Sequence, residues 1–377
     1  MKMHANRRRL LCATGALALS PWGFAVAASK SQEDGPGYTI AQVVDTSVAQ
    51  WDVSKDFMIG SRAAWQEVNA KGGLRDLQVR HATFEVDGTP QSIQDAVQAL
   101  SADRTCIALS ATAGERAALE LTMQLRKKNL ALAHVAPWLQ NSTLDVDNRT
   151  FPIFAGRQEQ ISYALRTIIE RGEREVGVIY ATDQDLHQYR EDIEQLARNL
   201  KLRLHTFEPK GDLGQMGHRL TPDTPVILLF VGGTPEIITF IQGIEGQRQR
   251  YVVALADVNL QTLSQLGGAR RIPIIGTQVV PVMSSKLPIV RNYKSVLAKR
   301  FDEPPSALSL AGFIAARYTF EVLNTVDGPM TRANVLKAFQ KRSFTDVGGF
   351  QISYGNARRS FNFVAQSMLT ADGRVVS

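Results

Sequence analysis

The sequence predicts an α/β protein built from two doubly wound lobes. From Tyr38 onward, strand-like and helix-like hydrophobic periods alternate, and this alternation is typical of a parallel sheet with helices on both faces. The alternation comes in two successive series, which indicates two sheets. A chain of 377 residues, 44% of them hydrophobic, is also long enough to bury two cores.

The first series covers residues 38–135. Its best-marked helix start is Thr89-Pro90, because a hydroxyl side chain can cap free backbone amides and proline fits the first helical position. Cys106 begins a short apolar run that is typical of a buried strand. The expected strands are 38–44, 77–86, 106–109 and 130–135, and the expected helices are 54–69, 90 onward and 114–127.

The second series includes a fully apolar strand at 226–231, which ends at Gly232-Gly233-Thr234-Pro235. Two further segments, 349–352 and 361–369, alternate like antiparallel strands. The other expected strands are 175–180, 251–255 and 272–280, and the expected helices are 165–169, 185–200, 235 onward, 287–300, 308–326 and 331–340.

Residues 1–28 are predicted to be a cleavable export signal. Arg7-Arg8-Arg9 is positive, the run that follows is mostly apolar, and Ala25-Val26-Ala27 offers a small-x-small cleavage site. An uncleaved membrane anchor is the alternative, since the apolar run approaches spanning length. The Arg-Arg-x-Leu-Leu pattern fits a twin-arginine signal, but a plain cationic segment serves the general pathway equally well. Periplasmic localisation is therefore expected. Cys12 lies inside this segment, which leaves Cys106 alone and without a disulfide partner in the mature chain.

Charge and motifs argue against nucleic-acid binding and catalysis. Four basic residues lie before residue 28, and without them 39 basic residues face 36 acidic ones. That small excess gives no reason to expect a nucleic-acid surface. The chain has no Gly-x-Ser-x-Gly elbow, His-Glu-x-x-His helix or Gly-Lys-Ser/Thr phosphate loop, and its six histidines show no metal-ligand spacing. We expect a binding protein with no catalytic residues, cofactor or metal. A hydrolase on an α/β sheet has no motif to support it.

Several segments together resemble the leucine/isoleucine/valine-binding proteins and the wider family of type I periplasmic binding proteins. Ala49-Gln50-Trp51 followed by Gly60 looks like the family's first ligand loop, and Asn69-x-x-Gly-Gly-Leu74 looks like the turn after its first helix. The remaining similar segments are Gly276–Pro281, Ser309–Ala316, Gly348–Phe350 and Thr370–Gly373. The resemblance extends over nearly the whole chain after residue 37.

The resemblance implies two lobes joined by a three-segment hinge. Lobe 1 would comprise residues 36–153 with 281–343, and lobe 2 residues 154–280 with 344–377. A small solute, with an amino acid as the leading candidate, would bind between lobes that close on it, and the closed form would dock on the membrane permease of an ABC transporter. A receptor of the same fold acting on a membrane sensor kinase is the alternative. Ala311 and Phe313 replace the family's usual glutamate and tyrosine, so the solute class stays open.

Ligand-contacting residues are expected at strand ends, where loops and helix N-termini meet. The resemblance assigns Ser110 and Thr112 to a carboxylate, although either could simply cap the next helix. Asp257 would pair with an α-amino group or cap its own helix, and Asp183 carries the same two alternatives.

Three larger side chains complete the expected site. Trp51 stands where the family often has a lining tyrosine, and it could instead take part in lobe packing. Arg157 could pair with an acidic solute group, or it could be a solvated surface residue. Trp138 follows the strand ending at Val135 and is expected near the cleft.

Overall fold

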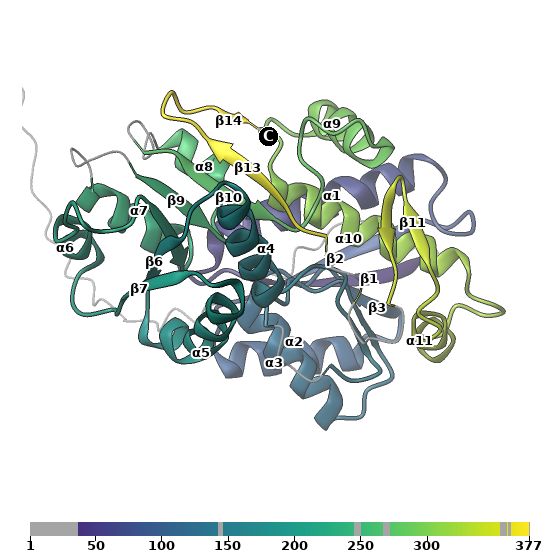
Figure 1. Ribbon diagram of the computed structural model, residues 1–377. Coiled ribbons are helices and arrows are strands. Elements are labelled where there is room, and N and C mark those ends of the chain that lie inside the picture. The colour runs from purple at the N-terminus through teal and green to yellow at the C-terminus, as the bar shows by residue number, and fades with distance from the viewer. Residues whose placement is uncertain are drawn as a thin grey trace, which may run out of the picture. The chain divides into compact units, whose positions relative to one another are not determined.

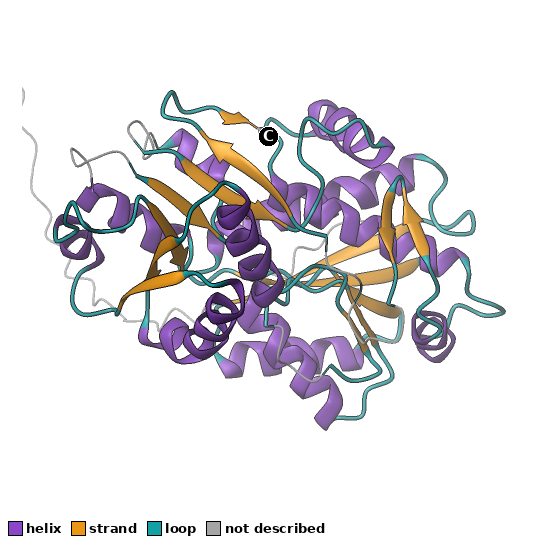
Figure 2. Ribbon diagram, viewed as in Figure 1, coloured by secondary structure: helices purple, strands orange, loops and turns teal. Residues whose placement is uncertain are grey.

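The computed structural model describes residues 37–141, 146–244, 250–266, 272–354, 360 and 363–376. The predicted export signal and Cys12 lie outside these residues. Two mainly parallel sheets organise the fold (Figures 1 and 2). The α/β class and the two series expected from the sequence are therefore confirmed.

The first sheet contains five parallel strands in the order β2-β1-β3-β4-β5. Its strands are β1 (Tyr38–Asp45), β2 (Val79–Val86), β3 (Cys106–Ser110), β4 (Ala133–Val135) and β5 (Thr150–Phe151). The helices between them are α1 (Trp51–Ala70), α2 (Pro90–Ala102) and α3 (Glu115–Lys127). As the sequence predicts, α2 begins at a Thr89 cap, whose side chain accepts a hydrogen bond from the Ser92 amide.

The second sheet has the order β14-β13-β10-β9-β8-β6-β7, in which β13 and β14 run antiparallel to their neighbours. Its strands are β6 (Glu175–Tyr180), β7 (Arg203–Phe207), β8 (Ile227–Val231), β9 (Tyr251–Ala254), β10 (Ile274–Gln278), β13 (Ala365–Leu369) and β14 (Val375–Val376). Its helices are α4 (Arg157–Glu170), α5 (Asp183–Leu200), α6 (Leu213–His218), α7 (Thr234–Ile244) and α8 (Leu260–Gln265).

Strand alternation places a core on each face of each sheet. In β1, Ile40 and Val44 belong to one buried cluster while Ala41 and Val43 belong to another on the opposite face. The strands of the second sheet alternate in the same way between two further clusters. Helices therefore cover both faces of each sheet, which is the doubly wound arrangement (Figure 2).

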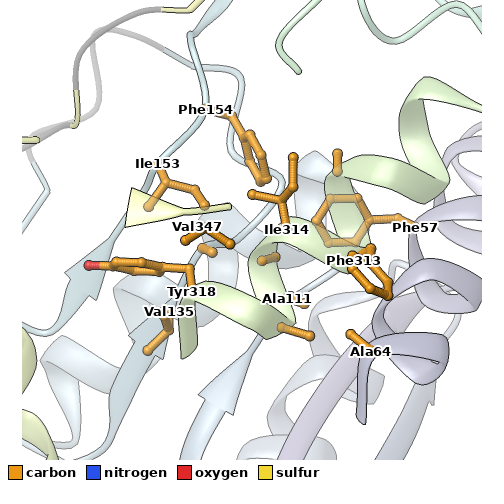
Figure 3. Packing of buried hydrophobic residues seen from close by; sticks show 14 of the residues in the cluster. Phe57, Ala64, Ala111, Val135, Ile153, Phe154, Phe313, Ile314, Tyr318 and Val347 are labelled. Carbon is orange, nitrogen blue, oxygen red and sulfur yellow. The ribbon is translucent and has the colours of Figure 1, made fainter. Parts of the chain in front are cut away.

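The largest cluster joins the first sheet to α1 and to the later helices α9 (Pro288–Arg300), α10 (Ala307–Asn324) and α11 (Arg332–Gln340). Figure 3 shows Phe57 of α1 and Phe313 and Ile314 of α10 in this cluster. The two helices cross closely at glycines, since a Cβ on Gly60 would lie 1.7 Å from the Ser309 carbonyl oxygen. Their backbones can therefore approach only without side chains at the crossing point.

The hairpin of β11 (Thr345–Val347) and β12 (Phe350–Ile352) packs with this first core. Val347, Phe350 and Ile352 are buried in the same cluster as α10. The sequence analysis placed a hinge segment near residue 344, immediately before this hairpin.

Candidate functional site

A cavity of about 860 Å³ lies where loops from both sheets meet. The first sheet contributes residues after each of its five strands, and the second contributes residues after β6, β8 and β9. All of these residues follow the carboxyl ends of parallel strands, where α/β proteins bind ligands. We refer to this cavity as the interlobe cleft, and its lining includes Ser47, Gln50, Gly88, Glu115, Arg116, Glu120, Asn141, Arg157, Thr182, Gln184, Asp185, Gln188, Gly232, Gly233, Glu236 and Asp257.

Arg157, the first residue of α4, forms an ion-pair network at the centre of this lining. Its Nε and Nη2 lie 2.8 Å and 2.7 Å from Oδ2 of Asp257. Nη2 also lies 3.1 Å from Glu115, and Nη1 lies 3.6 Å from Asp185. Glu115 begins α3 beside the first sheet, whereas the other two acids follow strands of the second. The guanidinium therefore joins the two halves of the protein.

Tyr189 completes the surroundings of this guanidinium. Nη1 donates a hydrogen bond of 3.1 Å to the Tyr189 hydroxyl, and the ring centroid lies 5.3 Å from the guanidinium carbon. Burial by itself lowers the pKa of Arg157, but the carboxylates of Asp257 and Glu115 outweigh burial and hold that pKa well above its ordinary value. Arg157 is therefore a fixed positive charge.

Asp257 also receives a hydrogen bond from Trp138. The indole Nε1 donates to Oδ1 across 3.0 Å, while Oδ2 faces Arg157. Trp138 is held in place by Phe57 at 5.5 Å and Phe154 at 5.7 Å between ring centroids. Trp138, Asp257 and Arg157 thus form a continuous chain from an aromatic core to the cleft.

A second cavity of about 510 Å³ is lined by Trp138. It is bordered by the end of β10, the N-terminus of α10 and the C-terminal hairpin, with Val279, Leu308 and Val376 among its apolar residues. Trp138 lines this second cavity and Arg157 lines the cleft, so the hydrogen-bonded chain through Asp257 lies between the two.

A separate polar contact joins α1 to the start of α8. Asn259 Nδ2 donates to Asp56 across 3.1 Å, and Thr262 donates to Asp52. Ser306, the cap of α10, donates to the same Asp56 carboxylate. Burial raises the pKa of Asp56 above its usual value, while the hydrogen bonds from Ser306 and Asn259 oppose that rise. We call this group the α1–α8 contact.

The structure brings three of the seven expected site residues together, namely Arg157, Asp257 and Trp138. Ser110 and Thr112 are buried and do not line the cleft. The Ser110 hydroxyl hydrogen bonds to Thr319 of α10 at 2.6 Å, and Thr112 hydrogen bonds to His134 at 2.9 Å. Their hydroxyl groups therefore hold the fold together.

The remaining two expected residues lie at helix starts. Trp51, the first residue of α1, is 47% exposed and does not line the cleft, although its neighbour Gln50 does. Asp183, the first residue of α5, is exposed, and Asp185 faces Arg157 instead. Asp257 is not a helix cap, because α8 is capped by the Asn259 side chain.

The sequence interpretation missed Glu115, Asp185 and Tyr189. The available signal for the two acids was their position in the first turns of α3 and α5, helices that follow cleft loops. Among the described residues, no group of three His, Cys, Asp or Glu side chains has the geometry of a metal site. None of the helices in the described ranges is long and apolar enough to cross a membrane.

Comparison with known proteins identifies relatives of this fold. The sequence profile of the periplasmic binding protein family matches residues 37–369. No curated protein sequence matches the chain.

Solved structures are similar at low sequence identity. An extracellular ligand-binding receptor from Verminephrobacter eiseniae is 16% identical, with a TM-score of 0.81 over 91% of this chain and 100% of that one. A branched-chain amino acid transporter substrate-binding protein from Streptococcus pneumoniae, solved with isoleucine, is 15% identical, with a TM-score of 0.73 over 90% and 98%. A fatty acid ABC transporter substrate-binding protein from Thermomonospora curvata is 13% identical, with a TM-score of 0.72 over 88% and 87%.

Proposed function

Because the chain belongs to the periplasmic binding protein family, we propose that it is the solute-binding receptor of an ABC-type importer and that its solute occupies the interlobe cleft. Proteins of this family bind solutes and are not enzymes. Among the similar solved structures, one contains isoleucine and another is a fatty acid ABC transporter substrate-binding protein, so the family alone does not define the solute of this chain.

The observation that carries the proposal is the ion pair between Arg157 and Glu115, whose side chains are only 13% and 18% exposed. It crosses the cleft, because Arg157 begins the first helix of the second sheet and Glu115 begins a helix of the first. The α1–α8 contact makes a second crossing through Asn259 and Asp56. These contacts form only when the two halves approach each other, so a solute that touches both halves would favour the same closed arrangement.

The lobes that close would have separate cores. We propose lobe 1 as residues 36–153 with the segment from 281, and lobe 2 as residues 154–280 with the C-terminal strands. In this proposal the chain would cross between them after β5, after β10 and before β13. Because the β11–β12 hairpin packs with α10, we place the third crossing after Tyr354 rather than near Phe344.

Arg157 and Asp257 are the proposed solute-contacting residues, since both line the cleft. Trp138 would support them from behind through its hydrogen bond to Asp257. Ser110 and Thr112 are left out of the proposed site, because their hydroxyl groups are already paired inside the first lobe.

The test is a cleft-filling substitution. The mature protein would be refolded to remove retained solute and screened by thermal shift, where a solute at about 100 times its Kd stabilises the fold by about 2.7 kcal/mol. Gln184→Trp places a bulky ring in the cleft from the first turn of α5, and Gln195→Trp makes the same change on the outer surface of that helix.

Gln184→Trp should weaken solute binding at least about tenfold, the equivalent of 1.4 kcal/mol, while Gln195→Trp leaves the Kd unchanged. Solute binding should also lower the radius of gyration measured by small-angle X-ray scattering. Unaltered binding by the Gln184→Trp protein would place the solute outside the cleft.

Export and a membrane partner complete the proposal. Residues 1–28 would direct the chain to the periplasm, and the closed receptor would dock on a permease. Cell fractionation after replacing Arg7 and Arg8 with lysine separates the two export routes, because only the twin-arginine route requires the arginine pair. Cytoplasmic retention of a precursor supports that route, and unchanged export supports the general one.

A further inference from the structure

The charge of the cleft lining is strongly negative. Five carboxylates line it against two guanidinium groups, which leaves a formal excess of three negative charges. The acidic residues are Glu115, Glu120, Asp185, Glu236 and Asp257, and the basic residues are Arg116 and Arg157. An anionic solute would enter against this field, whereas a cation would be attracted by it.

Arg157 does not reverse this balance. Asp257, Glu115 and Asp185 already surround its guanidinium at 2.7–3.6 Å. A solute carboxylate would have to displace one of these buried groups and leave that group without its cation, which is costly in a site with little water. Arg116, the other cation of the lining, is exposed at the rim.

Three of the helix N-termini around the cleft already carry negative charge. The N-terminus of a helix attracts negative charge through its free amides and its dipole. Here α3, α5 and α7 each carry their own acid in the first turn, namely Glu115, Asp185 and Glu236. Glu236 accepts the amide hydrogen of Gly233 at 3.2 Å, and Asp185 is hydrogen bonded to the α5 cap Thr182. The protein has thus filled these anion-binding positions with its own carboxylates.

A buried carboxylate lies behind the cleft wall. Asp45, at the end of β1, is fully buried, and its Oδ2 has no hydrogen-bond partner among the described residues. That oxygen lies 3.3 Å from the point where a Cβ on Gly88 would stand, and Gly88 lines the cleft. Because Gly88 has no side chain, this unpaired acceptor lies directly beside a backbone segment of the cleft lining.

We propose that the solute of the cleft is an organic cation that carries protonated amine groups. Protonated amines donate hydrogen bonds to carboxylates, which this lining supplies in excess. No aromatic side chain lines the cleft among the described residues, so it lacks the ring cage that typically recognises a quaternary ammonium. This inference rests on the proposed receptor function and specifies its solute class.

The test compares solutes of different charge on the refolded mature protein. The probes are putrescine and spermidine as protonated amines, choline as a quaternary ammonium, leucine as a zwitterion, and succinate as an anion. The amines should give the largest thermal shift and the lowest Kd by isothermal titration calorimetry. Their binding should weaken when sodium chloride is raised, because salt screens the attraction.

Charge variants define the site. Glu236→Gln should weaken amine binding about tenfold, since it removes a partner charge at the cleft. Arg116→Gln should strengthen it. Glu175→Gln removes the same charge at the start of β6, at the opposite end of that strand from the cleft, and should leave binding unchanged.

The outcomes separate this inference from the receptor function. If leucine or succinate binds most tightly and Gln184→Trp abolishes that binding, the cleft is a solute site and the amine inference is overturned. If choline matches the amines, the argument from hydrogen-bond donors is overturned. If amine binding is insensitive to Gln184→Trp and Glu236→Gln, both the inference and the receptor proposal fail, and if no probe binds, the amine inference is overturned.

Discussion

Replacing Arg157 with methionine tests whether the ion-pair network stabilises the fold. Methionine keeps much of the apolar length but removes the charge from beside Asp257, Glu115 and Asp185. The side chains of Arg157 and these three acids are only 9–18% exposed. Removing one partner from a buried pair costs about 3–5 kcal/mol, because the remaining charges stay buried without compensation. We expect a loss of this size in the free energy of unfolding.

Urea is the suitable denaturant, since it does not screen charges. With an m-value of about 3 kcal/mol/M, the expected loss lowers the unfolding midpoint by roughly 1–1.7 M. Arg190→Met is the matched control, because Arg190 also pairs with two carboxylates, Glu194 and Glu208, but on the exposed surface. Its midpoint should stay close to that of the wild type. Equal midpoints for both variants would refute the argument that burial gives the Arg157 network its stabilising effect.

The pH dependence distinguishes charge from packing. Burial already raises the pKa of Asp185, while its hydrogen bond from Thr182 and the charge of Arg157 oppose that rise. Without the guanidinium, the folded-state pKa of Asp185 moves further above its unfolded value. The cost at Asp185 is then fully present at neutral pH and decreases as the pH falls through that raised value. A loss of stability that stays constant with pH would assign it to packing.

Three further predictions concern other parts of the fold. Gly60→Ala should lower the free energy of unfolding by about 1–3 kcal/mol, because the new Cβ meets the Ser309 carbonyl, and an unchanged urea midpoint would contradict that crossing geometry. Burial raises the pKa of the Cys106 thiol to about 11, so a thiol reagent should label the mature chain only after unfolding, and native labelling would contradict this. Asn259→Asp keeps the α8 cap but adds a carboxylate beside those of Asp52 and Asp56. Small-angle scattering should therefore show an expanded protein at neutral pH, which contracts at acidic pH as Asp56 becomes protonated. Equal radii of gyration at neutral and acidic pH would contradict the α1–α8 contact.

The fold could be predicted because its signals are local. A strand such as β8 appears as a short apolar run, and the α2 cap appears as Thr89-Pro90. The edge strand β7 was missed, since Arg203–Phe207 is only partly buried and its two apolar residues, Leu204 and Phe207, do not alternate with polar ones. A strand of this kind is defined by its pairing with β6, which the sequence pattern does not display.

The site could be predicted only in part, because side-chain direction at a strand end depends on distant partners. Ser110 ends β3 as expected, but its hydroxyl faces Thr319, more than 200 positions later in the chain. Asp183 and Asp185 are two positions apart on α5, and only the second faces Arg157. Positions i and i+2 on a helix point in different directions, so the exact start of the helix decides which acid enters the site.

The Trp138–Asp257–Arg157 chain links the shape of the cleft to its chemistry. Oδ1 of Asp257 accepts a hydrogen bond from the Trp138 indole and Oδ2 accepts one from the Arg157 guanidinium. A displacement of the indole therefore shifts the carboxylate that holds the guanidinium, and the reverse is also true. The indole lines the second cavity and the guanidinium lines the interlobe cleft. A solute amine that binds Asp257 would therefore compete with Arg157 for Oδ2 and leave the guanidinium to Glu115, its partner across the cleft. Binding and closure would then be coupled through a single carboxylate, because the solute replaces at Asp257 the positive charge that it displaces.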